Sequence, residues 1–168
     1  LESQDNGQTF LPRQRISADN WIIKGCPHTG PTLAWTGKGL HAAWYTMGGG
    51  SGVYYSFQKP GTAFAPRETV GKLPSAKHPQ MAAFGKNHLA LVWDEQVPAS
   101  KTFASRLGLQ IRDANGKPIR QTYLTADTQH ASHPVVIGRK EHQFVVAYTK
   151  KNLGKSEVWV QVVDASTK

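Results

Sequence analysis

The sequence contains one cysteine, two methionines and no long apolar stretch. Because Cys26 has no second cysteine to pair with, a disulfide within the chain is excluded. No run approaches the roughly 20 apolar residues that span a bilayer, and no signal peptide is recognisable. We therefore expect a chain that is soluble as given, with no membrane partner and no cofactor.

Acidic residues are also scarce, with 11 Asp and Glu against 20 Lys and Arg, for a net charge of +9. An excess of this size raises the hypothesis of a polyanionic partner. The basic residues are scattered, however; the adjacent pairs are Arg139-Lys140 and Lys150-Lys151, and no nucleic-acid motif accompanies them. We therefore expect no nucleic-acid partner and interpret the charge as a solvated basic surface.

A repeated pattern dominates the middle of the chain. HPQMAAFGKNHLALVWDE at 78–95 has copies in GPTLAWTGKGLHAAWYT at 30–46 and HPVVIGRKEHQFVVAYT at 133–149. Each copy has a proline, a short apolar run, a turn, and a second apolar run that ends in an aromatic residue. A fixed period of this length predicts a solenoid, a propeller or another repeat array.

The N-terminal segment SQDNGQTF, Ser3 to Phe10, has the pattern S-x-D-x-G-x-T-F. It resembles the Asp box of sialidase-like, BNR-repeat β-propellers. In this motif the carboxylate, here Asp5, accepts backbone N–H bonds across a hairpin turn, and Gly7 supplies a permissive φ. We expect Phe10 to fill the space between neighbouring sheets, and we expect Asp5 to be structural rather than catalytic.

Degenerate versions of this turn follow at intervals of about 50 residues, which is the length of a four-stranded propeller blade. They lie near 56–64, where Gln58 replaces the aspartate, near 112–119 with Asp113, and near 162–168 with Asp164. We therefore expect residues 1–168 to form a single all-β unit of three Asp-box repeats.

The segments between these turns are enriched in Val, Tyr and Phe, as in strands. The predicted strands are Thr32–Trp35, Leu40–Thr46, Val53–Gln58, Phe64–Val70, Pro79–Phe84, His88–Trp93, Phe103–Arg112, Ile119–Thr125, Val135–Gly138, Gln143–Thr149 and Glu157–Val163. A twelfth, Pro12–Ser17, would supply the fourth strand that the last group lacks. The predicted fold is all-β, with propeller blades of four antiparallel strands, about three blades in all, or half of a six-bladed sialidase-like propeller.

Three blades cannot close a ring of the usual 4–8 blades. We therefore predict a partner: a second copy of the chain, with each terminus completing the other's blade, or the missing half of a longer parent chain.

In such a fold, the loops between blades gather at one axial face. This face would collect the connection WIIKGCPHTG at 21–30, of a kind found in uncharacterised bacterial BNR-repeat proteins, and the loop after Trp93. Trp44, Trp93 and Tyr148 share one repeat position and are interpreted as packing residues, whereas Trp21 and Tyr45 do not and could stack on a sugar. The candidate ligand-binding residues are Trp21, His28, Tyr45, His78, Asp94, Glu95 and His133.

Cys26 and His28 form a C-x-H pattern that could bind a soft metal, with Met47 as a further donor. His78 and His133 each begin an innermost strand and could converge on the same axis. The competing interpretation is that Cys26 is a small buried apolar residue and that each histidine bonds to the backbone.

The resemblance also implies a possible sialidase-like exo-glycosidase. Such enzymes use an arginine triad, a Tyr–Glu nucleophile pair and an acidic acid/base. Arg67, Arg106 and Arg139 are available, as are Tyr45, Glu95 and Asp94, but the family's Arg-Ile-Pro motif is absent and none of them matches the family's pattern residue by residue. We therefore assign no catalytic residue.

The sequence predicts a secreted or periplasmic propeller module that binds a glycan or protein through its axial face. The alternatives are part of a sialidase-like hydrolase and a metal-binding propeller that uses Cys26 and His28.

Overall fold

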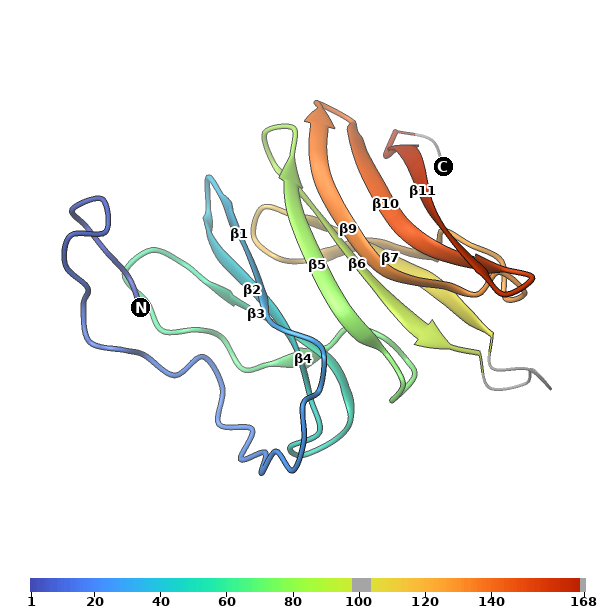
Figure 1. The fold of residues 1–168 in the computed structure, drawn as a ribbon. Coiled ribbons are helices and arrows are strands. Elements are labelled where there is room, and N and C mark those ends of the chain that lie inside the picture. The colour runs from blue at the N-terminus through green and yellow to red at the C-terminus, as the bar shows by residue number, and fades with distance from the viewer. Residues whose placement is uncertain (98–103, 167–168) are drawn as a thin grey trace.

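The computed structural model describes residues 1–97 and 104–166. This part of the chain is all-β, contains no helix, and forms three antiparallel sheets (Figure 1). It accordingly has no helix long and apolar enough to cross a membrane.

Each sheet is built from strands that are consecutive in the sequence. The first contains β1 (Thr32–Thr36), β2 (Gly39–Thr46), β3 (Gly52–Gln58) and β4 (Glu68–Thr69). The second contains β5 (Lys77–Phe84), β6 (His88–Gln96), β7 (Ser105–Asp113) and β8 (Pro118–Tyr123). The third contains β9 (Ala131–Lys140), β10 (Gln143–Asn152) and β11 (Lys155–Asp164). The predicted grouping into two sets of four strands and one of three is confirmed; Phe103 lies outside the described residues.

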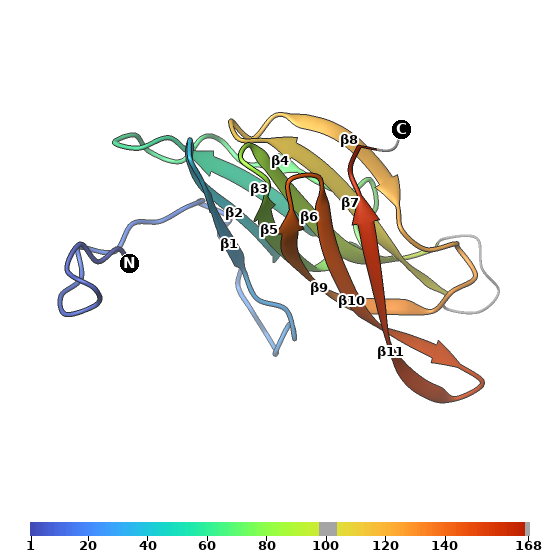
Figure 2. The same cartoon turned by 90° about the horizontal axis from the view of Figure 1, so that it is seen from above.

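The three sheets are stacked side by side, with β5 in contact with both β1 and β9 (Figures 1 and 2). The middle sheet therefore has neighbours on both faces. Strand β6 shows this most clearly, since Leu89 to Glu95 is buried without interruption. Successive side chains of a strand point to opposite faces, so a continuous apolar run is the pattern of a strand covered on both sides.

Two hydrophobic clusters fill the spaces between the sheets. On one face of β6, Leu89, Leu91 and Trp93 pack with residues of the first sheet, among them Val53 and Tyr55. On the other face, Ala90 and Val92 pack with the third-sheet residues Val136, Phe144, Val146 and Tyr148. The prediction that the aromatic residues at the shared repeat position pack the core is confirmed for Trp93 and Tyr148, whereas Trp44 is half-buried, lies in neither cluster and donates a hydrogen bond to Asp19.

A buried polar network ties the first sheet to the second. Arg112 on β7 is fully buried; it forms an ion pair with Glu68 of β4 and lies 3.6 Å from the ring centre of Tyr55. The Tyr55 hydroxyl is 2.6 Å from Nδ1 of His41, whose Nε2 is 2.9 Å from the Thr36 hydroxyl. Each of these buried groups has a polar partner, so the network joins the sheets without leaving a buried charge unpaired.

The predicted Asp-box turn geometry is present at Asp5. Its carboxylate accepts hydrogen bonds from the Thr9 backbone N–H (2.9 Å) and hydroxyl (2.5 Å), while Gly7 has a φ of +86°. These bonds stabilise the ionised form and lower the pKa of Asp5 to about 2. At the end of β7, Asp113 likewise accepts from the backbone N–H groups of Asn115 (2.9 Å) and Lys117 (2.8 Å).

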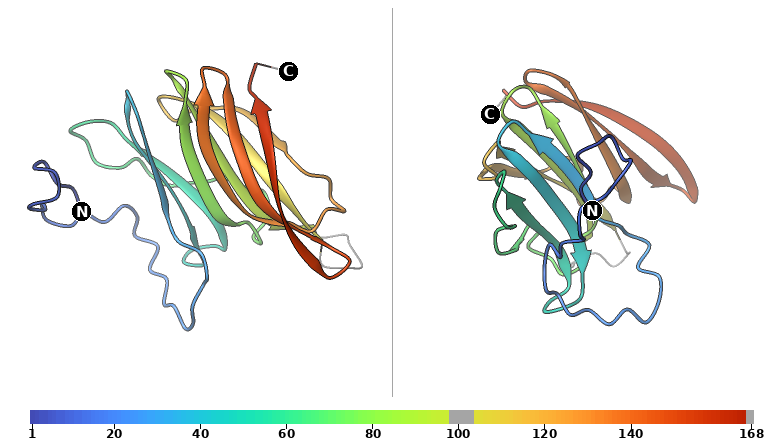
Figure 3. Two further views of the ribbon diagram at one scale, coloured as in Figure 1. Left: turned by 45° about the horizontal axis from the view of Figure 1, so that its top comes forward. Right: turned by 90° about the vertical axis from the view of Figure 1, so that its left-hand side faces the viewer.

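Three local predictions are wrong. Pro12–Ser17 is not a strand; residues 1–31 contain none, and residues 1–17 lie to one side of the first sheet, where they form no ladder with it (Figure 3). Phe10 is 59% exposed rather than packed between sheets, for the same reason. The bounds Phe64–Val70 are too wide: the ladder is confined to Glu68–Thr69, although Ala65 and Val70 also donate backbone hydrogen bonds to β3, and Pro66 has no N–H to donate.

The third sheet leaves one face uncovered in the described residues. Val135, Ile137, Val158, Val160 and Val162 are between 49% and 79% exposed. The register places Val162 beside Val145, which in turn lies beside Ile137, so these side chains form one continuous apolar face across three strands. At the opposite end of the molecule, Leu33 and Trp35 of β1 are also exposed.

The buried position of His41 predicts a loss of stability in mild acid. Burial, reinforced by the charge of Arg112, lowers the pKa of His41 from 6.5 to about 4. Between these values the unfolded chain binds a proton that the folded chain excludes, so the stability contribution is complete above pH 6.5 and is lost as the pH falls toward 4. The free energy of unfolding of the wild type should therefore fall from pH 7 to pH 4.5 by roughly 2–3 kcal/mol more than that of His41→Asn.

Urea unfolding at the two pH values measures this difference. His142→Asn is the matched control, because His142 is exposed in the turn between β9 and β10. An equal loss in the wild type and His41→Asn would contradict the assignment.

Candidate functional site

A polar cavity of about 460 Å³ lies at the edge where β2 and β6 end and β5 and β7 begin. In an antiparallel sheet, the end of one strand and the start of the next meet at the same edge, so distant residues are gathered here. The lining residues are Tyr45, Ser51, Pro74, Ser75, Lys77, His78, Asp94, Glu95, Gln96, Ser105 and Ser132.

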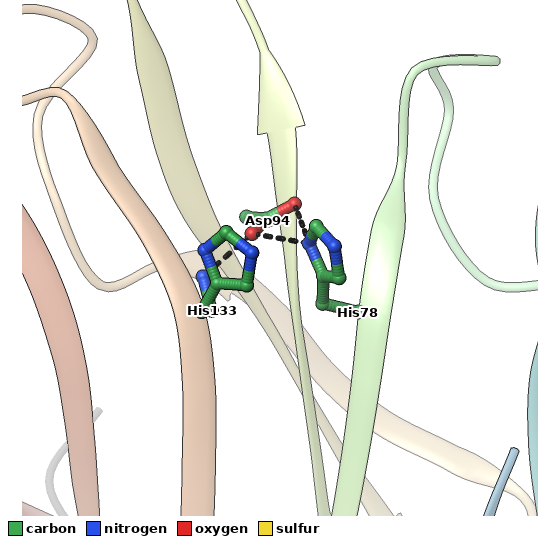
Figure 4. Close-up of side chains that lie close together, drawn as sticks. All are labelled: His78, Asp94 and His133. Atoms are coloured by element: carbon green, nitrogen blue, oxygen red, sulfur yellow. Dashed lines mark hydrogen bonds and ion pairs between the residues drawn. The ribbon is translucent and has the colours of Figure 1, made fainter. Parts of the chain in front are cut away.

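Asp94 faces the third sheet from the end of β6 and is 6% exposed. Its carboxylate oxygens lie 3.0 and 2.8 Å from Nδ1 of His78, and it accepts a 2.7 Å hydrogen bond from the backbone N–H of His133 (Figure 4). Asp94 thus joins the start of β5, the first strand of its own sheet, to the start of β9, the first strand of the third sheet.

Glu95 is 1% exposed and points to the opposite face of β6. Its carboxylate accepts hydrogen bonds from Nε and Nη2 of Arg106 (3.0 and 2.7 Å) and from Nε1 of Trp93 (2.9 Å). Arg106 also pairs with Asp127 and lies 3.5 Å from the ring centre of Tyr123. Burial, together with the nearby charge of Glu95, raises the pKa of Tyr123.

A second hollow of about 440 Å³ adjoins the first, with Tyr45 and Lys77 in the walls of both. Trp21 packs edge-on against Tyr45 with ring centres 5.6 Å apart, and Nζ of Lys77 lies 5.3 Å from the Tyr45 ring centre. Cys26, His28 and Met47 line the far part of this hollow.

Asp19 holds the segment that carries Trp21, and sequence reasoning missed it. It accepts hydrogen bonds from Nε1 of Trp44 (2.6 Å) and the Ser17 hydroxyl (2.5 Å), and it forms an ion pair with Arg67. Burial alone would raise the pKa of Asp19, but these bonds and the Arg67 charge outweigh it, and the pKa falls below its usual value. Asp19 lies outside the repeated pattern, so no signal in the sequence distinguishes it.

The structure thus brings together most of the residues singled out from the sequence. Tyr45, His78, Asp94 and Glu95 line one cavity; His133 stacks against His78; Trp21 and His28 line the adjoining hollow.

The side chains that lie close enough together to hold a metal ion do not include the predicted pair Cys26 and His28. In the described part of the chain, the one grouping of three metal-ligating side chains is His78, Asp94 and His133, which includes neither Cys26 nor His28. Cys26 is exposed rather than buried, so its interpretation as a small core residue is wrong.

The three candidate arginines do not form a free cluster. Arg67 and Arg106 are paired with Asp19 and Glu95, and Arg139 lies near the far end of β9 from His133.

No family model and no curated protein matches this chain.

The Glu95–Arg106 pair predicts a sharp loss of stability when it is broken. Arg106→Ala would leave the Glu95 carboxylate buried without its main countercharge, and breaking a buried pair from one side costs about 3–5 kcal/mol. The double variant Arg106→Ala/Glu95→Gln should recover part of this loss, because it removes the buried charge as well. Chemical unfolding of the three proteins provides the measurement; single and double variants of equal stability would count against the role of Arg106.

Proposed function

We propose that this chain is part of a sialidase-like, Asp-box β-propeller, and that it binds a glycan through the cavity at the ends of β2 and β6. The three consecutive sheets, stacked with their first strands adjacent, support the propeller proposal, since propeller blades are small antiparallel sheets arranged in this way.

The turns give the same proposal independent support. An Asp or Gln stands at the end of the third strand of every sheet, as Gln58, Asp113 and Asp164, and side-chain hydrogen bonds brace the chain after each. A blade repeat predicts such recurrence at one structural position, whereas an unrelated set of sheets gives no reason for it.

The apolar outer face of the third sheet and the exposed Leu33 and Trp35 of the first support the half-ring proposal. Exposed apolar areas of this extent mark interaction surfaces. We propose that further sheets cover both ends and that a second copy of the chain supplies them. Because Pro12–Ser17 is not a strand, the contact would use the sheet faces and the free edge of β11 in place of the predicted strand exchange.

The observation that carries the glycan proposal is that the polar cavity adjoins a second hollow whose wall contains aromatic side chains. Trp21, which is half-buried and packs on the buried Tyr45, offers ring surface on which a sugar face can stack, while Ser51, Ser75 and Gln96 offer donors and acceptors for its hydroxyl groups. A protein ligand remains the second candidate, favoured by the second hollow, where the exposed side chains of Ile22, Ile23 and Met47 add apolar surface.

Binding without hydrolysis is the better supported activity. A carboxylate-binding triad needs arginines that are free to bind substrate, but Arg67 and Arg106 are each committed to a carboxylate of the chain itself. Glu95 is likewise occupied by Arg106 and Trp93, and no Tyr45–Glu95 hydrogen bond exists among the described residues.

The glycan proposal predicts that the protein binds members of an oligosaccharide panel containing sialylated, galactosylated and glucose-based chains. Trp21→Ala should weaken binding of the best ligand at least about tenfold, or about 1.4 kcal/mol, because it removes the stacking surface. Trp159→Ala is the matched control, since Trp159 lies on β11, away from the cavity. Titration calorimetry measures the affinities.

Absence of binding to every member of the panel at millimolar concentration, or equal affinity of Trp21→Ala, would overturn the glycan proposal. Turnover of a fluorogenic sialoside, lost in Glu95→Gln, would replace it with the hydrolase alternative.

The assembly proposal predicts a mass of about twice 18.4 kDa at micromolar concentration. Val160→Lys should shift the protein toward the monomer, because it places a charge on the apolar face, midway along the edge strand β11. Light scattering coupled to size exclusion measures the mass, with Lys140→Ala as a surface control on the same sheet. A monomeric wild type that binds no apolar dye would contradict the proposal; a monomer that binds the dye, with less bound by Val160→Lys, would favour the missing half of a longer chain as the partner.

A further inference from the structure

His78 and His133 occupy equivalent places in two neighbouring sheets. Each lies within the first three residues of a first strand, each is followed by a proline, and each lies at an irregularity in the strand register. Their imidazole rings are stacked, with centres 4.1 Å apart and planes inclined by 29°. Asp94, on the intervening strand β6, contacts both residues (Figure 4).

The backbone at both histidines adopts a conformation that L-residues avoid. Their φ angles are +50° and +52°, in the region that glycine and asparagine enter more readily. Such departures persist only where the surrounding structure enforces them, and they concentrate at functional sites. Here the unfavourable conformation occurs at both residues whose side chains meet.

Backbone hydrogen bonding does not explain why the residues at positions 78 and 133 are histidines. The N–H of His133 donates to Asp94, and that of His78 donates to the Thr29 hydroxyl at 3.2 Å. Any residue except proline could make these two bonds, and glycine or asparagine would do so with less strain. These bonds are consistent with the register irregularities at both residues, but they do not explain why two imidazole side chains lie near the Asp94 carboxylate.

The three side chains have the composition of a metal site. One nitrogen from each histidine and one oxygen of Asp94 lie within 4.8 Å of one another. Donors around a tetrahedral zinc ion lie about 2.0–2.2 Å from the metal and hence about 3.4 Å apart, so rotation of the imidazoles has to bring the three donor atoms closer together. His133 is exposed and His78 is half-buried, which leaves room for that rotation, while the buried Asp94 is fixed.

We propose that His78, His133 and Asp94 bind one divalent transition-metal ion of the zinc class. Two imidazoles and one carboxylate suit zinc, whereas calcium and magnesium prefer oxygen ligands alone. Three protein ligands leave a coordination position open, and His78 and Asp94 both line the polar cavity, so the ion borders on it. Lys77, the sequence neighbour of His78, lines the same cavity and brings a positive charge that would oppose the ion.

This inference does not depend on a glycan ligand. The metal is tested alone, with untagged protein, by titration calorimetry with Zn²⁺ and by elemental analysis after dialysis. We expect one bound ion for each chain. His133→Gly, which removes the imidazole and suits the backbone conformation, should weaken binding about tenfold or more, as should Asp94→Asn.

His142→Ala is the matched control, since it removes an exposed histidine far along the sheet and should bind zinc as the wild type does. Co²⁺ provides a second readout, because its visible absorption reports coordination by protein ligands and should disappear in His133→Gly. The proposal is overturned if the wild type binds no Zn²⁺ at millimolar concentration, or if His133→Gly binds it with unchanged affinity. Should Asp94→Asn fail to fold, His133→Gly alone decides.

Discussion

The structure depends on the burial of β6 on both of its faces. Because a strand alternates its side chains, Leu89, Leu91 and Trp93 serve one interface while Ala90 and Val92 serve the other. Close approach within the sheet is part of this packing: Gly108 of β7 lies so near Trp93 that a Cβ there would be 2.1 Å from the indole ring. The first and third sheets are thus held in place by a single central sheet.

The same alternation organises the polar edge. At the end of β6 the apolar run gives way to Asp94 and Glu95, and each turns to a different neighbour. Asp94 binds the start of β9, whereas Glu95 is held by Arg106 within its own sheet. The cavity therefore lies where the apolar interior ends, and its two acidic groups are fixed by the packing that fixes β6.

Much of the architecture was predictable because it is local and repeated. The proline, the apolar runs and the closing aromatic residue mark strand positions directly, and the turn at Asp5 follows from residues within one hairpin. Pro12–Ser17 has strand-like composition, but a strand also needs a neighbour with free hydrogen-bonding groups, which composition does not reveal. Phe10 failed for the same reason, since its burial depends on where the hairpin lies.

The sequence indicated most of the residues of the candidate site but not the contacts that join them. His78 and His133 were expected near one another from their equivalent repeat positions, and Asp94 from its place after Trp93. That Asp94 would bridge them depends on a register irregularity at each histidine, and bulges of this kind are a matter of three-dimensional fit. Asp19 and its ion pair with Arg67 join segments far apart in sequence, which a single sequence without an alignment does not reveal.

The free edge of β11 has a consequence for how the chain matures. Residues 157–163 read EVWVQVV, a stretch rich in β-branched residues, without proline and with a single charge. Segments of this type, when they lie on an open sheet edge, template pairing with other chains and seed aggregation. The lysines at 150, 151 and 155 lie beside the turn of the hairpin and oppose such pairing by charge repulsion. If the proposed second copy covers this sheet, the protein's yield in a cell would depend on how soon after synthesis the two copies meet, as well as on the stability of the finished fold.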